Sequence, residues 1–250
     1  MDFVKMHGLG NDFVVITGPT EPTREDIVAW CDRRRGIGAD GVLEVSPLDD
    51  SAVRMRYWNA DGSLAEMCGN GLRCVARYAV DEAFVESADF IVNTAVGALP
   101  VHVNTDGTVR AFLGRASLGE ELVVGDTRLH TVDIGNPHAV QWVDDPDVAE
   151  VGSVGPLIER AEPFPSGTNV EFATVSAPDT IKLRVWERGV GETLACGTGA
   201  AATAYLAHRL GKVGREVAME LRGGTLRVDL ADEGVWIEGP AETVFSGRLY

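Results

Sequence analysis

A stretch of 19 residues occurs twice in this chain, and each copy ends just after a cysteine. The first copy, VRMRYWNADGSLAEMCGNG, occupies residues 53–71, and the second, IKLRVWERGVGETLACGTG, occupies residues 181–199. A shift of 196 − 68 = 128 positions aligns Cys68 with Cys196, and Gly-x-Gly follows both. GNDFVV at 10–15 and GNPHAV at 135–140 form a second pair at nearly the same offset. Such a repeat predicts a duplicated fold that brings two thiols to one cleft.

The length and composition agree with two halves. A chain of 250 residues with 45% hydrophobic and 24% charged residues can build two well-packed domains. Periodicity is lost in AFLGRASLGE at 111–120, which predicts a boundary there. We expect an N-terminal domain at 1–113 that carries Cys68 and a C-terminal domain at 114–250 that carries Cys196. The last strand is free to pack back on the first domain.

The local patterns predict an α+β fold. Many short segments alternate apolar and polar residues as strands do, and turn signals such as Asp61-Gly62 and Asp106-Gly107 separate them. After each repeated cysteine the pattern becomes helical, in LRCVARYAVDEA and in AAATAYLAHRL, which ends at Gly211. Thr23-x-x-Asp26 resembles a capping box that opens the helix DIVAWCDRR. Two pseudo-symmetric domains are expected, each a strand-rich sheet wrapped on one principal helix.

The charge excludes two classes of partner. A net charge of −16 repels nucleic acids and anionic membranes, so neither is expected to bind.

The first residues lack the layout of a secretory signal, and no apolar run approaches a membrane span. Four cysteines without disulfide-framework spacing indicate a reducing cytoplasm. The scarcity of lysine fits either a salt-rich interior or a genome whose bias replaces Lys with Arg.

Cys68 and Cys196 are each expected at a helix N-terminus. The unsatisfied backbone N–H groups and the positive end of the helix dipole favour a thiolate there, and the same amides can hold a carboxylate. Two such helix ends at one carboxylate would stabilise the charge that develops as the neighbouring Cα loses its proton. No cofactor loop or pyridoxal-type lysine site is recognisable. The sequence therefore predicts cofactor-free proton transfer, with one thiolate as base and the opposite thiol as acid.

The remaining two cysteines, Cys31 and Cys74, lie on helical apolar faces and are expected to be small buried hydrophobes. A zinc site is disfavoured because the four cysteines lack Cys-x-x-Cys spacing, and we expect no metal. A disulfide between Cys68 and Cys196 remains open as an oxidative side reaction.

Polar residues near the cysteines suit an amino-acid substrate. Asn59 and Glu187 lie nine positions before the two cysteines, and Glu187-Arg188 places an anion beside a cation. His138 is a candidate for adjusting the thiols, or it hydrogen-bonds locally. Asn11, Asn136 and Asn169 follow Gly or Gly-Thr, so turn formation accounts for them equally well.

Motifs over nearly the whole chain resemble the diaminopimelate epimerase family. They are MHGLGNDFVV at 6–15, GIGADG at 36–41, WNADGS at 58–63, MCGNGLRC at 67–74, GNPH at 135–138, TNVEF at 168–172 and ERGVGETLACGTGA at 187–200. The related proline racemases typically carry a His where this chain has Asn70. The resemblance implies two barrel-like domains, each around a central helix, with the active site in the cleft between them.

The resemblance also implies an activity and a set of residues. It implies cofactor-free interconversion of LL- and meso-diaminopimelate in lysine biosynthesis, with Cys68 and Cys196 as the acid/base pair. His138 and Glu187 match positions thought to tune the thiols. The implied substrate contacts are Asn11, Asn59, Gly69, Asn70, Asn136, Asn169, Glu187, Arg188, Gly197 and Thr198. The chain departs from the family at Gly41, where many members carry a side-chain amide that touches the substrate, so this contact is not carried over.

We therefore expect a cytoplasmic, homodimeric isomerase that takes a small amino acid. One alternative is a sister racemase for another amino acid, such as histidine. The other is a thiol-bearing binding or redox protein that catalyses no proton exchange.

Overall fold

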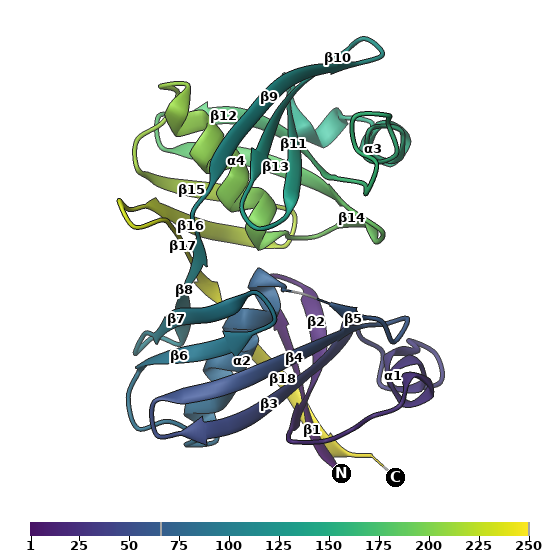
Figure 1. The fold of residues 1–250 in the computed structure, drawn as a ribbon, viewed down its shortest axis with the longest axis vertical. Coiled ribbons are helices and arrows are strands. Elements are labelled where there is room, and N and C mark those ends of the chain that lie inside the picture. Colours follow the sequence, from purple (N-terminus) through teal and green to yellow (C-terminus); the bar gives the residue numbers. More distant parts are fainter. Residues whose placement is uncertain (66, 250) are drawn as a thin grey trace. The chain divides into compact units, whose positions relative to one another are not determined.

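A computed structural model describes residues 1–65 and 67–249 of the chain (Figure 1). The chain forms two compact units: unit 1 contains Met1–Ala111 and Gly239–Tyr250, and unit 2 contains Phe112–Glu238. The last strand thus belongs to unit 1. The predicted domain boundary after residue 113 stays a prediction.

Unit 1 combines a mixed sheet with two helices. Its strands run β18–β1–β2–β3–β4–β6–β7–β8, and β5 adds to the edge of β4. The pairs β2–β3 and β4–β6 are parallel, and the others are antiparallel. The elements are β1 (Asp2–Gly8), β2 (Asn11–Thr17), α1 (Arg24–Cys31), β3 (Gly41–Asp49), β4 (Ala52–Asn59), β5 (Leu64–Ala65), α2 (Gly69–Asp81), β6 (Asp89–Thr94), β7 (Gly97–Val103), β8 (Thr108–Gly114) and β18 (Glu242–Arg248).

Unit 2 repeats this plan. Its strands run β9–β10–β11–β12–β13–β15–β16–β17, β14 adds to β13, and the pairs β11–β12 and β13–β15 are parallel. The elements are β9 (Ser117–Val124), β10 (Thr127–Asp133), β11 (Pro137–Trp142), η1 (Pro146–Val148), α3 (Val151–Glu159), β12 (Asn169–Ala177), β13 (Thr180–Glu187), β14 (Gly191–Thr193), α4 (Gly197–Arg209), β15 (Glu216–Leu221), β16 (Gly224–Leu230) and β17 (Val235–Pro240). The prediction of two repeated, strand-rich halves is confirmed.

In each unit the sheet curls around one principal helix. Helix α2 packs against β1, β2, β3, β4, β6 and β7, and α4 packs against β10, β11, β12, β13, β15 and β16. Figure 1 shows α4 lying across the strands of its unit. The first turns of both helices are wholly buried, so the cysteines that precede them are anchored to the cores.

Two predicted helix ends agree with the structure, whereas α1 ends at Cys31, three residues before the end of the predicted segment DIVAWCDRR. Thr23 caps α1 in a complete capping box with Asp26, as expected. Helix α4 ends with Gly211 beyond its C-cap, and the φ of +70° at this residue is the left-handed conformation that glycine adopts without strain. None of the helices in the described chain combines the length and the apolar character that a bilayer span requires.

Candidate active site

Cys68 and Cys196 are the N-cap residues of α2 and α4, as predicted. Both have extended backbones, with φ of −144° and −124°. The backbone N–H of Gly71 donates to the sulfur of Cys68, and that of Gly199 donates to the sulfur of Cys196, both at 3.4 Å. The repeated sequence thus builds the same thiol cap twice. Each cap presents a sulfur beside the N–H groups of a first helical turn, which have no carbonyl partner within the helix.

In unit 1 the sulfur belongs to a small amide cluster. The thiol of Cys68 lies 3.5 Å from Asn11 Oδ1, which also accepts from Asn70 Nδ2 at 3.2 Å. Asn11 in turn donates to the carboxylate of Asp40 at 2.7 Å. Two loops that lie far apart in the sequence therefore meet at Cys68, and each asparagine is held by a partner.

A cluster of ion pairs holds Asp40, the hydrogen-bond partner of Asn11, on the side of Asn11 away from Cys68. Asp12 pairs with Lys5 and Arg33 at 2.7 Å, and Arg33 also pairs with Asp40 at 2.6 Å. Burial raises the pKa of Asp12, but hydrogen bonds from Arg33 and Lys5 outweigh burial and lower that pKa to about 2. The two carboxylates and two cations balance, so the cluster fixes geometry while adding little net charge.

Arg73, one turn into α2, is fully buried and reaches the amide cluster through Asn70. It donates to Asn70 Oδ1 at 2.9 Å, and to the carbonyls of Gly69 and Pro240 at 3.3 Å. Burial lowers the pKa of Arg73 to about 10, so the guanidinium stays charged at neutral pH.

In unit 2 the sulfur joins a chain of polar groups. Cys196 Sγ lies 3.4 Å from the hydroxyl of Thr198, which accepts from Asn136 Nδ2 at 3.3 Å. His138 lies between Asn136 Oδ1, 3.0 Å from its Nε2, and Glu171 Oε1, 2.6 Å from its Nδ1. Both ring nitrogens thus face oxygen atoms. His138 and Glu171 are both almost completely buried.

Glu187 makes this second site acidic. Its carboxylate accepts a short hydrogen bond from Thr193, and loss of hydration raises the pKa of Glu187 to about 7 despite that bond. Burial, together with the charges of Glu187 and Glu171, also raises the pKa of Cys196 well above its usual value. The helix N-terminus was expected to favour a thiolate here. At Cys196 burial and the two carboxylates outweigh it.

The remaining predicted residues lie at strand ends. Asn169 donates to the carbonyl of Pro137 at 3.0 Å and accepts from the backbone N–H of Arg188 at 2.9 Å. The guanidinium of Arg188 is exposed, and no hydrogen-bond partner for it occurs among the described residues. Asn59, at the end of β4, donates to the hydroxyl of Ser63 at 3.0 Å. Asn11, Gly69 and Asn70 thus gather at Cys68, whereas Asn136, His138, Glu187, Gly197 and Thr198 gather at Cys196.

Gly41 has no room for a side chain. It pairs with Asn59 across β3 and β4, and a Cβ would lie 2.4 Å from the carbonyl oxygen of Trp58 and 2.6 Å from the ring of Tyr57. The departure from the family pattern is therefore accommodated by close packing of the two strands. A side chain at this position would require the strands to shift.

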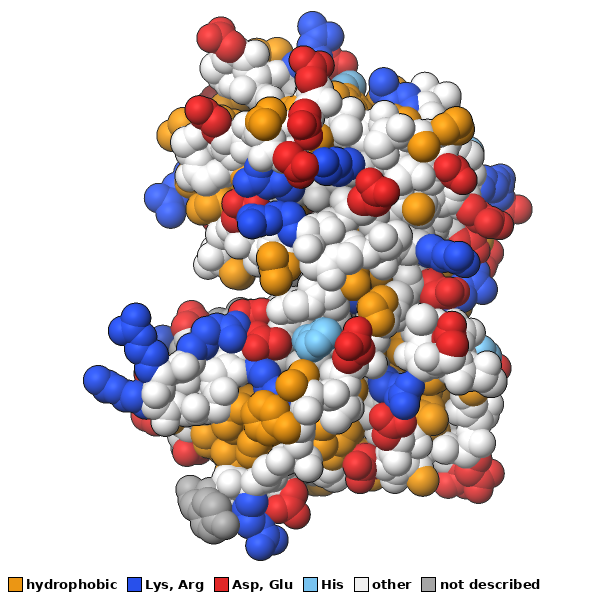
Figure 2. Space-filling model, turned by 180° about the vertical axis from the view of Figure 1, so that it is seen from behind, with side chains coloured by type: hydrophobic (Ala, Val, Ile, Leu, Met, Phe, Trp, Pro, Cys, Tyr) orange, Lys and Arg blue, Asp and Glu red, His pale blue; other side chains and the backbone are white. Residues whose placement is uncertain are grey.

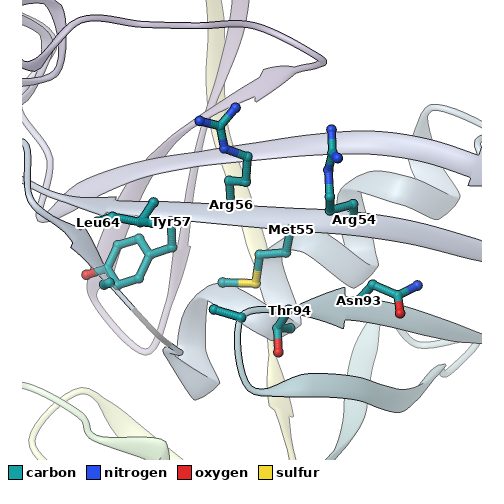
Figure 3. Close-up of a pocket in the computed structure, with 9 residues that line it drawn as sticks. Arg54, Met55, Arg56, Tyr57, Leu64, Asn93 and Thr94 are labelled. Atoms are coloured by element: carbon teal, nitrogen blue, oxygen red, sulfur yellow. The ribbon is translucent and has the colours of Figure 1, made fainter.

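A pocket of about 220 Å³ lies elsewhere in unit 1 (Figure 3). It occupies the edge of β4 between its pairing with β5 and its pairing with β6. In Figure 3, Met55 and Tyr57 lie on the opposite side of β4 from Arg54 and Arg56. The residues that line this pocket include neither cysteine and none of the predicted substrate contacts.

The sequence analysis missed three residues that support the thiols: Asp40, Arg73 and Glu171. All three lie inside motifs that were recognised, but nothing in their local pattern shows that they contact a site residue. A signal did exist for Glu171, since a charged residue in the middle of an apolar strand needs a buried partner. Among the residues that the structure describes, no group of three or more His, Cys, Asp or Glu is arranged to hold a metal ion.

Comparisons with known proteins agree over the whole chain. The family model described as diaminopimelate epimerase matches residues 3–119 and 130–244. A diaminopimelate epimerase from Heliobacterium modesticaldum is 42% identical over 279 residues, which cover 100% of this chain and 99% of the relative. One from Synechococcus elongatus is 39% identical over 274 residues, covering 100% and 98%.

Solved structures share the fold at low sequence identity. A predicted epimerase from Pseudomonas aeruginosa has a TM-score of 0.79 at 15% identity, covering 99% of this chain and 98% of its own. A hydroxyproline epimerase from Agrobacterium vitis has a TM-score of 0.75 at 16% identity, covering 99% and 91%. These likenesses support the fold alone. The family match and the full-length relatives decide the family: the chain belongs to the diaminopimelate epimerases.

Proposed function

We propose that this protein interconverts LL- and meso-diaminopimelate without a cofactor, using Cys68 and Cys196 as base and acid. The observation that carries the proposal is the matched pair of thiol caps, in which each sulfur accepts from a helix-terminal N–H at 3.4 Å. Inversion at Cα removes a proton from one face and returns one to the other face. Each face therefore needs its own group, and two equivalent thiols meet that need.

The same helix ends would hold the reacting carboxylate. The backbone amides of Gly69-Asn70 and of Gly197-Thr198 lie in first helical turns, where N–H groups lack partners inside the helix. Those groups stabilise an anion, and more strongly as charge moves from Cα onto the carboxylate. This stabilisation lowers the barrier to proton removal in place of an electron-withdrawing cofactor.

The part of the site that binds the distal end of the substrate would select for a second amino-acid group. Arg188 offers an exposed guanidinium that can take a carboxylate, and its backbone is held by Asn169. Asn11, Asn59 and Asn136 add amide groups that can contact ammonium or carboxylate. His138 and Glu187 would tune the acid at Cys196, because His138 is linked to it through Asn136 and Thr198.

We propose a cellular context together with this activity. We place the enzyme in lysine biosynthesis, in the cytoplasm and as a homodimer. Size-exclusion chromatography with light scattering tests the dimer: a monomeric mass at assay concentration would contradict it.

Solvent isotope incorporation tests the reaction itself. The protein is incubated with LL-diaminopimelate in deuterated water, and the products are separated and their masses measured. We expect meso-diaminopimelate with one deuterium at the inverted carbon, because the returning proton comes from a thiol that exchanges with solvent. Absence of both meso product and deuterium would leave only a binding or redox role. Faster turnover of a compact amino acid, such as histidine, would favour a sister racemase.

A further inference from the structure

We propose that Arg73 is a positioning residue that orients Asn70 and biases Cys68, and not Cys196, toward the thiolate before substrate binds. The inference rests on the proposed function and assigns unequal starting roles to the two thiols. Cys68 starts as the base, and Cys196 starts as the acid.

The first observation is that Arg73 is a buried cation with only neutral partners. Its exposed fraction is 0%, and it donates to two backbone carbonyls and to Asn70 Oδ1. No carboxylate within the described chain forms an ion pair with it. A buried charge without a counter-ion is costly, so the fold gains when an anion forms nearby. The thiolate of Cys68, the N-cap residue of the same helix, is such an anion, and it interacts electrostatically with Arg73.

The second observation is that the chain leaves room for this guanidinium. A Cβ on Gly8 would lie 2.9 Å from Arg73 Nη2 and 3.3 Å from the Cβ of Asn70. The φ of Gly8 is not positive, so space and not backbone conformation calls for glycine there. The glycine of β1 thus lets the guanidinium reach the asparagine side chain.

The third observation is that unit 2 carries the opposite charge. The shift of 196 − 68 = 128 places Ala201 at the position of Arg73, and Glu171 at the position of Leu43. It also places Glu187 at the position of Asn59. One thiol therefore has a buried cation, whereas the other has two carboxylates with a single histidine. Opposite local charges favour opposite protonation states.

Among the residues that the structure describes, the other ionisable groups near Cys68 do not supply the same bias. Asp12 and Asp40 are balanced by Lys5 and Arg33 in the cluster behind Asn11. Cys74, which directly follows Arg73 in α2, is fully buried, and burial raises its pKa to about 12, so it stays neutral. One further pair lies on the neighbouring strands β1 and β18 and is partly exposed: His7 and Glu242, 4.0 Å apart.

The asymmetry is tested first on the wild-type protein without substrate. Iodoacetamide reacts with thiolates, and peptide mass spectrometry measures the alkylation rate of each cysteine across a pH series. The pH of half-maximal rate depends on ionisation, whereas access of the reagent changes only the plateau. We expect this midpoint to lie at least about one pH unit lower for Cys68 than for Cys196. Equal midpoints, or a lower one for Cys196, would overturn the proposal.

Variants then separate charge from shape. Arg73→Met should raise the Cys68 midpoint by about one unit or more, which slows alkylation at neutral pH about tenfold or more, and should leave the Cys196 midpoint in place. Arg73→Lys keeps the charge, so the midpoint should stay near that of the wild type, while loss of the Nη2 hydrogen bond to Asn70 raises KM more than it lowers kcat. Arg77→Met, one turn further along α2 at an exposed ion pair with Asp81, is the matched control and should change neither value.

Several outcomes contradict the assignment. An unshifted Cys68 midpoint in folded Arg73→Met would do so, and so would a shift in Arg73→Lys as large as in the Met variant. If Arg73→Met does not fold, the wild-type midpoints and the Lys variant decide. The alkylation midpoints need no turnover, so a protein with the predicted asymmetry but no deuterium incorporation would overturn the proposed function and the base and acid roles, and would leave only the effect of Arg73 on the ionisation of Cys68 standing.

Discussion

At the scale of single residues, the structure separates two helix-capping thiols from two thiols that only pack in the core. Cys68 and Cys196 cap helices, whereas Cys31 and Cys74 are packed in the core of unit 1, where burial raises the pKa of Cys31 to about 11 and that of Cys74 to about 12. We expect Cys68→Ala and Cys196→Ala each to reduce epimerisation to near background, because each face of Cα then lacks its proton carrier. Cys31→Ala and Cys74→Ala should keep turnover and lose about 1–2 kcal/mol of stability. Near-normal epimerisation by either of the first two variants would exclude the two-thiol mechanism.

Substrate specificity is also expected to depend on a single side chain, that of Arg188. Arg188 offers a guanidinium that the described residues leave available, so Arg188→Ala should cost about 2–4 kcal/mol in kcat/KM, typical of losing a charged contact. Arg160→Ala, in the same unit but at the end of α3, is the control. Steady-state kinetics with LL-diaminopimelate measures the change, and equal turnover of an amino acid without a distal carboxylate would contradict the assignment.

The raised pKa of Glu187 predicts that the stability of the fold depends on pH. Its pKa is raised from 4.5 to about 7, chiefly by loss of hydration. Below pH 4.5 the carboxyl is protonated in both folded and unfolded chains, so it contributes nothing. Between pH 4.5 and 7 only the unfolded chain ionises, so the free energy of unfolding falls as pH rises. Above pH 7 the folded form ionises as well, and the full loss of stability is present. Glu187→Gln should therefore gain stability over the wild type between pH 4.5 and 7, by up to about 3 kcal/mol. Urea unfolding at several pH values measures this, and a gain that does not depend on pH would contradict it.

At the scale of elements, helices with cap residues and strands with one buried face could be predicted from the sequence. Thr23 caps α1 and Asp26 completes the box, so Thr23→Ala should destabilise unit 1 by about 1 kcal/mol. Glu25→Ala, in the same exposed turn but outside the box, should cost clearly less. Thermal unfolding of both variants measures the difference, and equal losses would show that the cap adds nothing.

The elements that sequence analysis missed have weak local signals, for two different reasons. Strands β9 and β18 are exposed along nearly their whole length, so no alternating pattern marks them, and the loss of periodicity at 111–120 resembles irregular chain. Helix α3 contains Gly152, Gly155 and Pro156 and has no side-chain cap, so its local sequence argues against a helix. Gly155 is needed there because a Cβ would lie 2.6 Å from the ring of Trp186.

The repeated cysteine motifs could be predicted as a site because one chemical task imposes the same local sequence twice. The supporting residues Glu171 and Arg73 could not, because they depend on contacts that only the fold creates.

At the scale of the whole molecule, the open question is what the net charge of −16 does. Figure 2 shows acidic and basic side chains interspersed on the visible faces of both units, so the excess is spread and not gathered at one patch. Spread carboxylates repel one another in dilute buffer, and salt relieves this because the screening length falls from about 10 Å at 0.1 M to about 3 Å at 1 M. If the composition reflects a salt-rich interior, the melting temperature should rise markedly over that range of potassium chloride, and epimerisation should persist at 1 M. Potassium chloride is the salt to use, since sulfate would stabilise any fold by exclusion from its surface. A melting temperature that does not change, with full activity in dilute buffer, would instead show that the composition records only the replacement of lysine by arginine.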